Sequence, residues 1–255
     1  MCLILVALNQ RSDLPLVLAA NRDEYFARPT RAAGYWEDAP GVLGGRDLEA
    51  GGSWLGVDTG GRLAAVTNVR EPPLRKTGLE SRGRLVSDYL KTTTSPADYL
   101  QEVIRRRQRF DGYNLLVGST TELLYHASRD ARYLRLEGGV HGISNGALDC
   151  SWPKVNRGKA ALRRCLEDDA ALDPERLFEL LADTGVPEDE TLPDTGVGLE
   201  MERQLAPIFV RMDGYGTRCS TLIVLEAGGR LRFYERVFSE DGGIVETGRF
   251  EFEIE

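Results

Sequence analysis

The chain begins Met1-Cys2-Leu3-Ile4-Leu5-Val6-Ala7-Leu8, a cysteine in the second position followed directly by six apolar residues. A short apolar run that ends in a polar turn is typical of a buried strand, and Asn9 to Asp13 supply that turn. Pro15 to Ala20 form a second apolar run, which predicts the partner strand. The amino end therefore predicts two buried strands, with Cys2 at the start of the first.

Cys2 combines two groups that catalysis can use. A small second residue normally permits an aminopeptidase to remove Met1, after which Cys2 carries a free α-amine beside its thiol. An α-amine has a pKa of about 7.7–8.0, so it can accept a proton near neutral pH and serve as the base for the thiol nucleophile. The alternative interpretation is a strand that happens to begin with cysteine, a small residue that is common in cores.

Periodicity and turn residues predict the remaining elements. Helices are expected at residues 83–91, 96–107, 153–167 and 174–182, and Ser95-Pro96 and Asp173-Pro174 have the form of an N-cap followed by proline. A hairpin is expected at residues 54–57 and 62–67, turned by the pair Gly60-Gly61. Further strands are expected at residues 113–118, 122–127, 133–136, 140–144, 221–226, 230–238 and 249–254. Residues 184–198, rich in glycine, proline and acid, predict a mobile loop.

The order of these elements predicts the fold class. Strands, two helices, strands, two helices and strands follow one another in groups, which favours an α+β protein with antiparallel sheets. We expect a four-layer αββα sandwich, in which two stacked sheets carry a helix pair outside each. No repeat or long linker divides the chain, so residues 1–255 are expected to form a single domain.

Composition narrows the partners and the compartment. The 255 residues are 42% hydrophobic and 28% charged, and the formal net charge of −8 argues against nucleic acid and gives no support to binding an anionic membrane surface. No segment is long enough to span a bilayer, and the first apolar run lacks the basic region of a signal peptide. The cysteines lack paired spacing, which is typical of free thiols in a reducing compartment. These observations predict a cytoplasmic protein; the cysteines are Cys2, Cys150, Cys165 and Cys219.

Histidine chemistry is scarce in this chain. His126 and His141 are the two histidines, so a histidine-ligated metal site is not expected. Gly142 to Gly146 match the G-x-S-x-G pattern of a nucleophile elbow, but both histidines precede Ser144, whereas that triad runs from serine to acid to histidine. A hydrolase on this chain would need another base, and the Cys2 amine is one.

A run of polar residues follows the second predicted strand. Asn21, Arg22, Asp23 and Glu24 stand together at the strand end, where they are placed to face a cleft. A solvated turn is the alternative interpretation of such a run. Trp54, in the first predicted hairpin, would line an apolar pocket or pack in the core.

These motifs resemble those of the NRDE family, also called the transport and Golgi organisation protein 2 family. The likeness covers essentially the whole chain, and the matching motifs are Met1-Cys2, Leu18 to Glu24, Gly51 to Gly56, Leu63 to Asn68, Tyr113 to Leu115, Gly142 to Asn145, Trp152 to Lys154 and Tyr215 to Arg218. The family is similar to the N-terminal nucleophile hydrolases, whose fold is the αββα sandwich, and within them to the choloylglycine and penicillin V acylases.

The resemblance implies a role for particular residues. It makes Cys2 the nucleophile and Asp23 the acid that holds its amine. Asn68 and Asn145 match side chains around the oxyanion hole, and Arg218 matches an arginine close to the thiol. The residues expected at the substrate are Asn21, Arg22, Glu24 and Trp54.

One position departs from the acylase pattern. Those acylases carry an arginine three residues before the aspartate, where this chain has Ala20. Arg22 lies next to Asp23, so on an extended strand it should point to the opposite face. The charge near Cys2 is therefore expected to differ from that in the acylases.

Two functions follow from these observations. The first is hydrolysis of a non-peptide amide bond in a small N-acyl substrate through an acyl-Cys2 intermediate, with no cofactor and no metal. The second is a non-catalytic binding protein for haem or an acyl lipid, because eukaryotic members of the family are linked to haem trafficking and to lipid or acyl-CoA homeostasis. Cys2 would then be a soft ligand for haem iron. A purely structural interpretation, in which Asn21 to Glu24 only cap a turn, stands beside both.

Overall fold

Strand β1 (Cys2–Leu8) lies between β2 (Leu16–Tyr25) and β10 (Gly139–Ile143) in a computed structural model of the chain, which describes residues 2–70, 79–167 and 171–254. All three strands are antiparallel to their neighbours. The predicted pairing of the two amino-terminal strands is therefore confirmed, and Cys2 begins a central strand rather than an edge strand.

Two antiparallel sheets form the centre of the fold. The first has the order β10-β1-β2-β12-β13-β14, with β11 beside β12. Its other strands are β11 (Arg211–Met212), β12 (Tyr215–Leu225), β13 (Arg230–Phe238) and β14 (Ile244–Glu253). The second runs in chain order from β3 to β9. Its strands are β3 (Thr30–Trp36), β4 (Ala39–Asp47), β5 (Leu55–Asp58), β6 (Arg62–Asn68), β7 (Tyr113–Ser119), β8 (Leu123–Ala127) and β9 (Leu134–Arg135).

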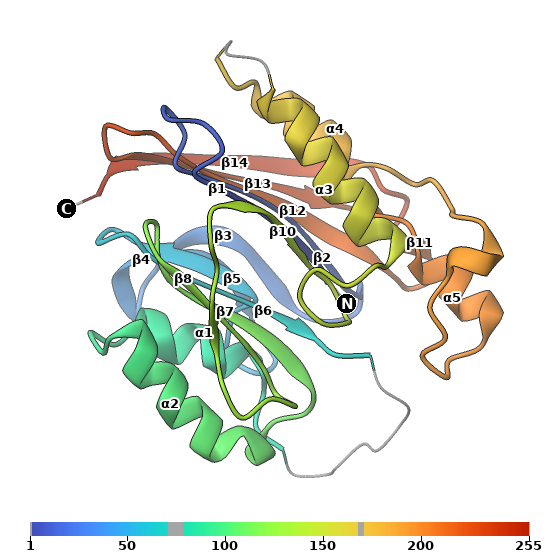
Figure 1. Cartoon of the computed structure of the whole chain (residues 1–255), viewed down its shortest axis with the longest axis horizontal. Helices are drawn as coiled ribbons and strands as arrows, with labels where there is room; N and C mark the ends of the chain where they lie inside the picture. Colours follow the sequence, from blue (N-terminus) through green and yellow to red (C-terminus); the bar gives the residue numbers. More distant parts are fainter. Residues whose placement is uncertain (1, 71–78, 168–170, 255) are drawn as a thin grey trace.

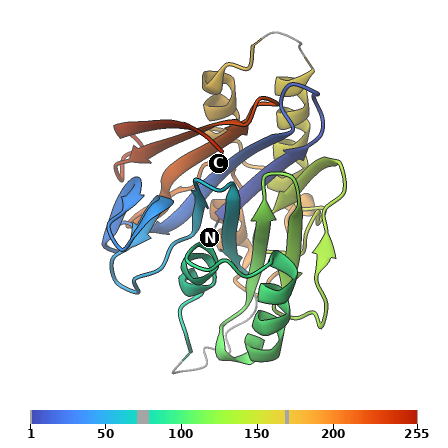
Figure 2. The ribbon, with the colours of Figure 1, turned by 90° about the vertical axis from the view of Figure 1, so that its left-hand side faces the viewer.

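Helices cover the outer face of each sheet, as Figures 1 and 2 show. The pair α1 (Gly83–Leu90) and α2 (Pro96–Arg106) packs on the second sheet, and α3 (Pro153–Leu166) and α4 (Pro174–Leu181) pack on the first. A short helix, α5 (Leu199–Leu205), and two 3-10 turns, Arg107–Arg109 and Asp189–Thr191, complete the elements. The α+β sandwich of two antiparallel sheets is confirmed.

The side chains of β1 point alternately to two covered faces, which explains why its sequence is apolar without interruption. Ile4 and Val6 pack between the sheets, whereas Leu3 and Leu5 pack against the helix layer, and all four are buried. A strand covered on both faces has no polar side. Burying a side chain of this size stabilises the fold by about 1.5–3 kcal/mol. The strand that carries Cys2 is consequently among the best anchored in the molecule.

Several local signals act as predicted. The Ser95 hydroxyl accepts a hydrogen bond from the Asp98 N–H at 3.1 Å, and the Asp173 carboxylate accepts one from the Glu175 N–H at 2.9 Å. Both caps are followed by proline at the first helical position. Gly61 adopts a φ of +80° in the β5–β6 turn, a conformation that favours glycine.

The structure differs from the expectation in several places, and strands β12 and β14 begin earlier than residues 221 and 249, at Tyr215 and Ile244. Strand β2 continues through the polar run to Tyr25, so these residues belong to the sheet rather than to a turn. Strands β3 and β4 were not predicted, because their glycines and half-exposed positions weaken the period of two. Helix α5 was not predicted either, and it follows directly on the loop expected at residues 184–198.

Within the described residues, none of the helices is both long and apolar enough to cross a membrane.

Candidate active site

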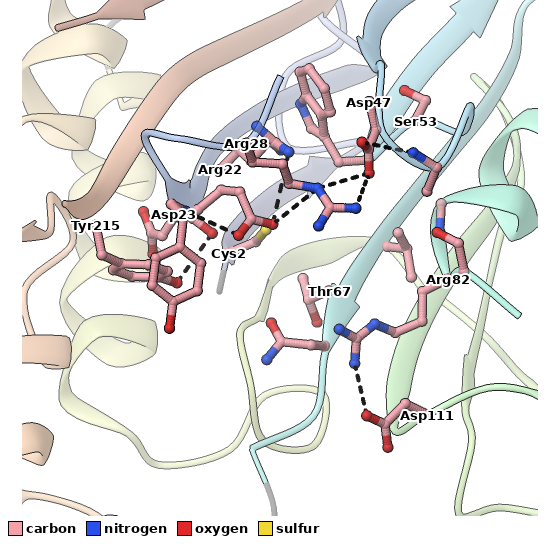
Figure 3. A pocket seen from close by; sticks show the side chains of 18 of the residues that line it. Cys2, Arg22, Asp23, Arg28, Asp47, Ser53, Thr67, Arg82, Asp111 and Tyr215 are labelled. Atoms are coloured by element: carbon pink, nitrogen blue, oxygen red, sulfur yellow. Dashed lines mark hydrogen bonds and ion pairs between the residues drawn. The ribbon is translucent and has the colours of Figure 1, made fainter. Parts of the chain in front are cut away.

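A cavity of about 800 Å³ opens where β1, β2 and β6 meet near the amino terminus (Figure 3). Its lining comes from β1 and β2, the loop after β4, the end of β6, the segment before α1, helix α5 and the β11–β12 turn. Six of the predicted site residues line it: Cys2, Arg22, Asp23, Glu24, Trp54 and Asn68. Segments far apart in the sequence therefore supply one site.

Cys2 is half-buried in this cavity, and its backbone is held on both sides. Its direct partner on β2 is Arg22, and its carbonyl accepts a hydrogen bond from the Ser144 hydroxyl at 3.0 Å. Burial raises the pKa of the Cys2 thiol; the charge of Asp23 raises it further and that of Arg22 lowers it. A thiol in this position needs a base or a nearby cation to become a thiolate. Ser144, the serine of the rejected nucleophile-elbow pattern, supports the nucleophile candidate instead.

Arg22 supplies a cation on the face of the sheet that Cys2 occupies. Ala20 and Arg22 are two residues apart on β2, so they share this face, while Asp23 lies on the other. The Arg22 guanidinium lies 4.2 Å from the centre of the Trp54 ring, a cation–π contact, and 3.9 Å from the Glu24 carboxylate. The expected orientation of Arg22 away from Asp23 is correct. Ala20 brings no charge to this face, but Arg22, two residues further along β2 and the direct partner of Cys2, does bring one, and its charge lowers the pKa of the thiol.

Asp23 is buried on the helix-facing side of β2. Its Oδ1 accepts a hydrogen bond from the Thr217 hydroxyl at 2.7 Å, and its carbonyl accepts one from the Tyr215 hydroxyl at 3.2 Å. Burial raises the pKa of the Asp23 carboxyl, while Lys154 and the Thr217 hydrogen bond act in the opposite direction. A buried carboxylate beside the start of β1 is suited to orienting an amine on Cys2.

The two predicted oxyanion asparagines are in contact, but only one faces the cavity. Asn68 lines it at the end of β6. Asn145 is fully buried, and its Nδ2 donates to both the carbonyl and the Oδ1 of Asn68 at 3.0 Å each. With Oδ1 of Asn68 engaged in this way, its Nδ2 is the group left to donate into the cavity. Asn145 therefore orients Asn68 instead of facing a ligand itself.

A hydrogen-bond network fixes the end of β6 on the loop after β10. The Thr67 hydroxyl donates to the Ser144 carbonyl at 2.5 Å. Asn114 Nδ2 donates to the same carbonyl at 3.1 Å and to the Gly146 carbonyl at 2.9 Å. Because these groups are buried, their hydrogen bonds are costly to break. They hold Asn68 and Cys2, which come from different sheets, at a fixed separation.

The cavity walls carry further arginines, each with an acidic neighbour. Arg28 donates to Asp47 at 2.7 Å and lies 3.9 Å from Glu24. On the wall across from Arg22 and Arg28, as Figure 3 shows, Arg82 donates to the Gly112 carbonyl at 3.1 Å and lies 4.0 Å from Asp111. The cavity therefore offers charged groups of both signs around the thiol.

Besides Asn145, two predicted site residues do not line the cavity. Asn21 is buried on the helix-facing side of β2, where it donates to the carbonyls of Leu181 and Ile208 at 2.8 and 2.9 Å. Its place in the polar run suggested substrate contact, but its side chain ties β2 to the helix layer. The expectation at the substrate is therefore wrong for Asn21.

Arg218 is the second correction. A bulge between Thr217 and Cys219 breaks the alternation of β12. The Arg218 guanidinium donates to the carbonyls of Tyr25, Phe26 and Arg28, at 2.8, 3.3 and 3.1 Å. It holds the turn after β2 and does not lie beside the thiol.

Sequence reasoning gave no role to Thr217 or Lys154, although both stand in quoted motifs. The role of Thr217 can be recognised only in the structure, from its pairing with Asp23. Lys154 had a signal: it precedes Val155 and Gly158 on the buried face of an amphipathic helix, where a lysine is unexpected. Among the described residues, no group of three His, Cys, Asp or Glu side chains could hold a metal ion.

Comparison with known proteins gives matches along the whole chain. The profile of the family described as Transport and Golgi organisation 2 matches residues 1–240. The Transport and Golgi organization protein 2 homolog of Homo sapiens is 34% identical, with 100% of both chains covered. The homolog of Mus musculus is 32% identical, with the same 100% coverage of both.

Two solved structures share the fold at low identity. The C2A mutant of a conjugated bile acid hydrolase from Clostridium perfringens matches with a TM-score of 0.54 and 10% identity, over 98% of this chain and 92% of that chain. An N-acylethanolamine-hydrolyzing acid amidase ortholog from Caenorhabditis elegans matches with a TM-score of 0.50 and 10% identity, over 88% and 92%. The fold is therefore that of the N-terminal nucleophile hydrolases.

Proposed function

This chain belongs to the Transport and Golgi organisation 2 family, and on that premise we propose that it hydrolyses the amide bond of a small N-acyl compound through an acyl-Cys2 intermediate. The observation that carries the proposal is that Cys2, Asp23 and Asn68 come together in one cavity. The bile acid hydrolase of the same fold adds support, because its C2A mutation marks a cysteine at its own second position.

The reaction begins after removal of Met1. The Cys2 amine accepts the thiol proton, and the sulfur attacks the acyl carbon. The carbonyl oxygen gains negative charge and accepts a hydrogen bond from Asn68 Nδ2; a donor of this kind is worth about 3–4 kcal/mol in the transition state. As the C–N bond breaks, the ammonium returns its proton to the leaving nitrogen, and the acyl group stays on Cys2 as a thioester.

Water completes the cycle. The Cys2 amine takes a proton from water as the hydroxyl attacks the thioester carbon, and the thiolate leaves and is reprotonated. Asp23 keeps the amine oriented in both steps without giving up its own negative charge. The pKa direction at Cys2 agrees with this division of roles, because a thiol whose pKa is raised by burial depends on a base placed beside it.

Intact-mass measurement after incubation with a panel of acyl amides and acyl thioesters tests the proposal. The expected result is a chain that lacks Met1 and gains the mass of the acyl group on Cys2. Cys2→Ala should abolish the gain, whereas Cys150→Ala, which changes a partly exposed cysteine outside the cavity lining, should retain it. Retention of Met1 would block the amine and exclude this mechanism.

The same experiment separates the second function. A non-catalytic protein for haem or an acyl lipid would bind its ligand in the cavity and show no acyl adduct with any member of the panel. For haem, a titration that gives the same spectrum with wild type and Cys2→Ala would remove Cys2 as an iron ligand.

A further inference from the structure

Lys154 is a buried cation in the second position of α3. Its residue is 3% exposed, and within residues 2–70, 79–167 and 171–254 its Nζ has no hydrogen-bond partner. Lys159, on the same helix, is by contrast paired with Asp149 at 2.5 Å. Burying an ammonium without a partner is expensive. The charge of a buried ammonium acts more strongly on neighbouring groups than it would in water.

The charged and titratable groups whose charges act on Lys154 come from four parts of the fold. They are Cys2 on β1, Asp23 on β2, Arg70 after β6 and Glu202 on α5. Tyr215 on β12 also acts on this group, because its hydroxyl donates to the Asp23 carbonyl, and burial together with the charge of Asp23 raises the pKa of Tyr215. Burial lowers the pKa of Lys154 to about 8, and Asp23 acts most strongly in the opposite direction. Lys154 is therefore still largely protonated at pH 7.

Glu202 is already occupied by other donors. Its Oε2 pairs with Arg70, and its Oε1 accepts from the Thr195 N–H at 2.9 Å and from the Thr195 hydroxyl at 2.5 Å. Both carboxylate oxygens of Glu202 thus have partners, Arg70 and Thr195. Of the two carboxylates that act on Lys154, Asp23 is therefore the one left to balance its charge.

We propose that Lys154 is a positioning residue whose ammonium balances the Asp23 carboxylate and so keeps the Cys2 amine neutral and able to accept the thiol proton. This inference rests on the proposed function. Asp23 alone, beside the amine, would favour the ammonium form and remove the base at neutral pH. The second cation offsets that effect. Lys154 keeps its own proton throughout, because the proton moves only from the thiol to the amine.

The test measures the protonation of the residue-2 amine directly. In a Cys2→Ala background, which keeps a small second residue and removes the thiol, cyanate carbamylates only the neutral amine, and peptide mass mapping follows the rate against pH. Lys154→Met should raise the pKa of this amine by about one unit, so the carbamylation profile shifts to higher pH and its acid limb, below the pKa of the parent amine, slows about tenfold. Lys159→Met, on the same helix, should leave the rate unchanged.

A Lys154→Met profile that coincides with the parent profile, or shifts to lower pH, would overturn the inference. Lys154→Gln is the second variant if methionine is not tolerated, with circular dichroism as the check of folding for each protein. Retention of Met1 in the peptide map would overturn both this inference and the proposed function.

Measurement of turnover further separates the role of Lys154 from the proposed hydrolase function. If wild type hydrolyses a substrate, Lys154→Met should shift the acid limb of kcat/KM to higher pH by about one unit, which a merely structural lysine would not do. If wild type hydrolyses nothing in the panel, the proposed function fails. The carbamylation profiles still decide whether Lys154 controls the amine.

Discussion

Cys2 and Arg22 face each other across the β1–β2 ladder, and their side chains share the face of the sheet that meets Trp54. Direct partners on antiparallel strands place their side chains together. The cation near the thiol therefore depends on the register between the two strands, and a shift by one residue would move it to the other face.

Replacement of Arg22 should reduce the reactivity of Cys2. Arg22→Gln removes a positive charge that lowers the pKa of the thiol, so less thiolate is present at neutral pH. We expect iodoacetamide to alkylate Cys2 several-fold more slowly at pH 7, as measured by intact mass. Arg31→Gln changes an exposed arginine and is the control; equal alkylation rates in the two variants would contradict the role of Arg22.

Asn145 and Asn68 should act as a unit. If Asn68 donates to the oxyanion, Asn68→Ala lowers kcat by about 10²–10³-fold. Asn145→Ala leaves that amide in place without its support, so a smaller loss of kcat is expected. The double variant should be no worse than Asn68→Ala, because the two changes remove one interaction. Multiplicative losses would instead assign Asn145 an independent role, and Asn156→Ala, at an exposed position, is the control.

Gly45 makes room for Trp54 in the cavity wall. A Cβ on Gly45 would lie 2.1 Å from the indole ring, whereas a Cβ on Gly34, in the neighbouring strand, would have nothing within 4 Å. Gly45→Ala should therefore displace Trp54 and lower the free energy of unfolding by about 1–3 kcal/mol. Urea titration and tryptophan fluorescence measure both effects. Gly34→Ala should leave the fluorescence as in wild type, and equal behaviour of the two variants would refute this packing.

Glu235 should make stability depend on pH between about 4.5 and 6. Burial raises its pKa from 4.5 to about 6, although the Ala33 N–H, Cys219, Thr221 and Arg22 act in the opposite direction. The folded protein then keeps a proton that the unfolded chain releases, so stability falls as the pH rises through this window, by about 2 kcal/mol in total.

Comparison of wild type with Glu235→Gln isolates this contribution. The difference in unfolding free energy, wild type minus variant, should decrease by about 2 kcal/mol between pH 4 and pH 7. Denaturant titrations at each pH give the two values. Glu246→Gln, at an exposed position on β14, should show no such change. A difference that stays constant with pH would show that Glu235 titrates normally.

The strand pair at the amino end, both caps and the two-sheet architecture could be predicted because they depend on local patterns. An apolar run bounded by polar residues needs burial on both faces whatever its neighbours are, and Ser95-Pro96 begins a helix through its own hydrogen bond. The sequence did not predict strands β3 and β4. The reason for their glycines lies in contacts across the sheet, such as that between Gly45 and Trp54, and these contacts are visible only in the structure.

The candidate site, like the fold, has features that the sequence alone predicts and features that depend on the tertiary structure. Sequence alone determined that Cys2 begins a buried strand, that histidine chemistry is scarce and that a polar run follows the second strand. The tertiary structure decided where these side chains lie: register placed Arg22 opposite Cys2, a bulge in β12 directed Arg218 to the turn after β2, and Asn21 faces the helix layer. Lys154 acquired its buried place from the packing of α3 against β1 and β10, where the charge of Asp23 acts on it. A residue's type and spacing limit what it can do, but burial and charge depend on neighbours that come from distant parts of the chain.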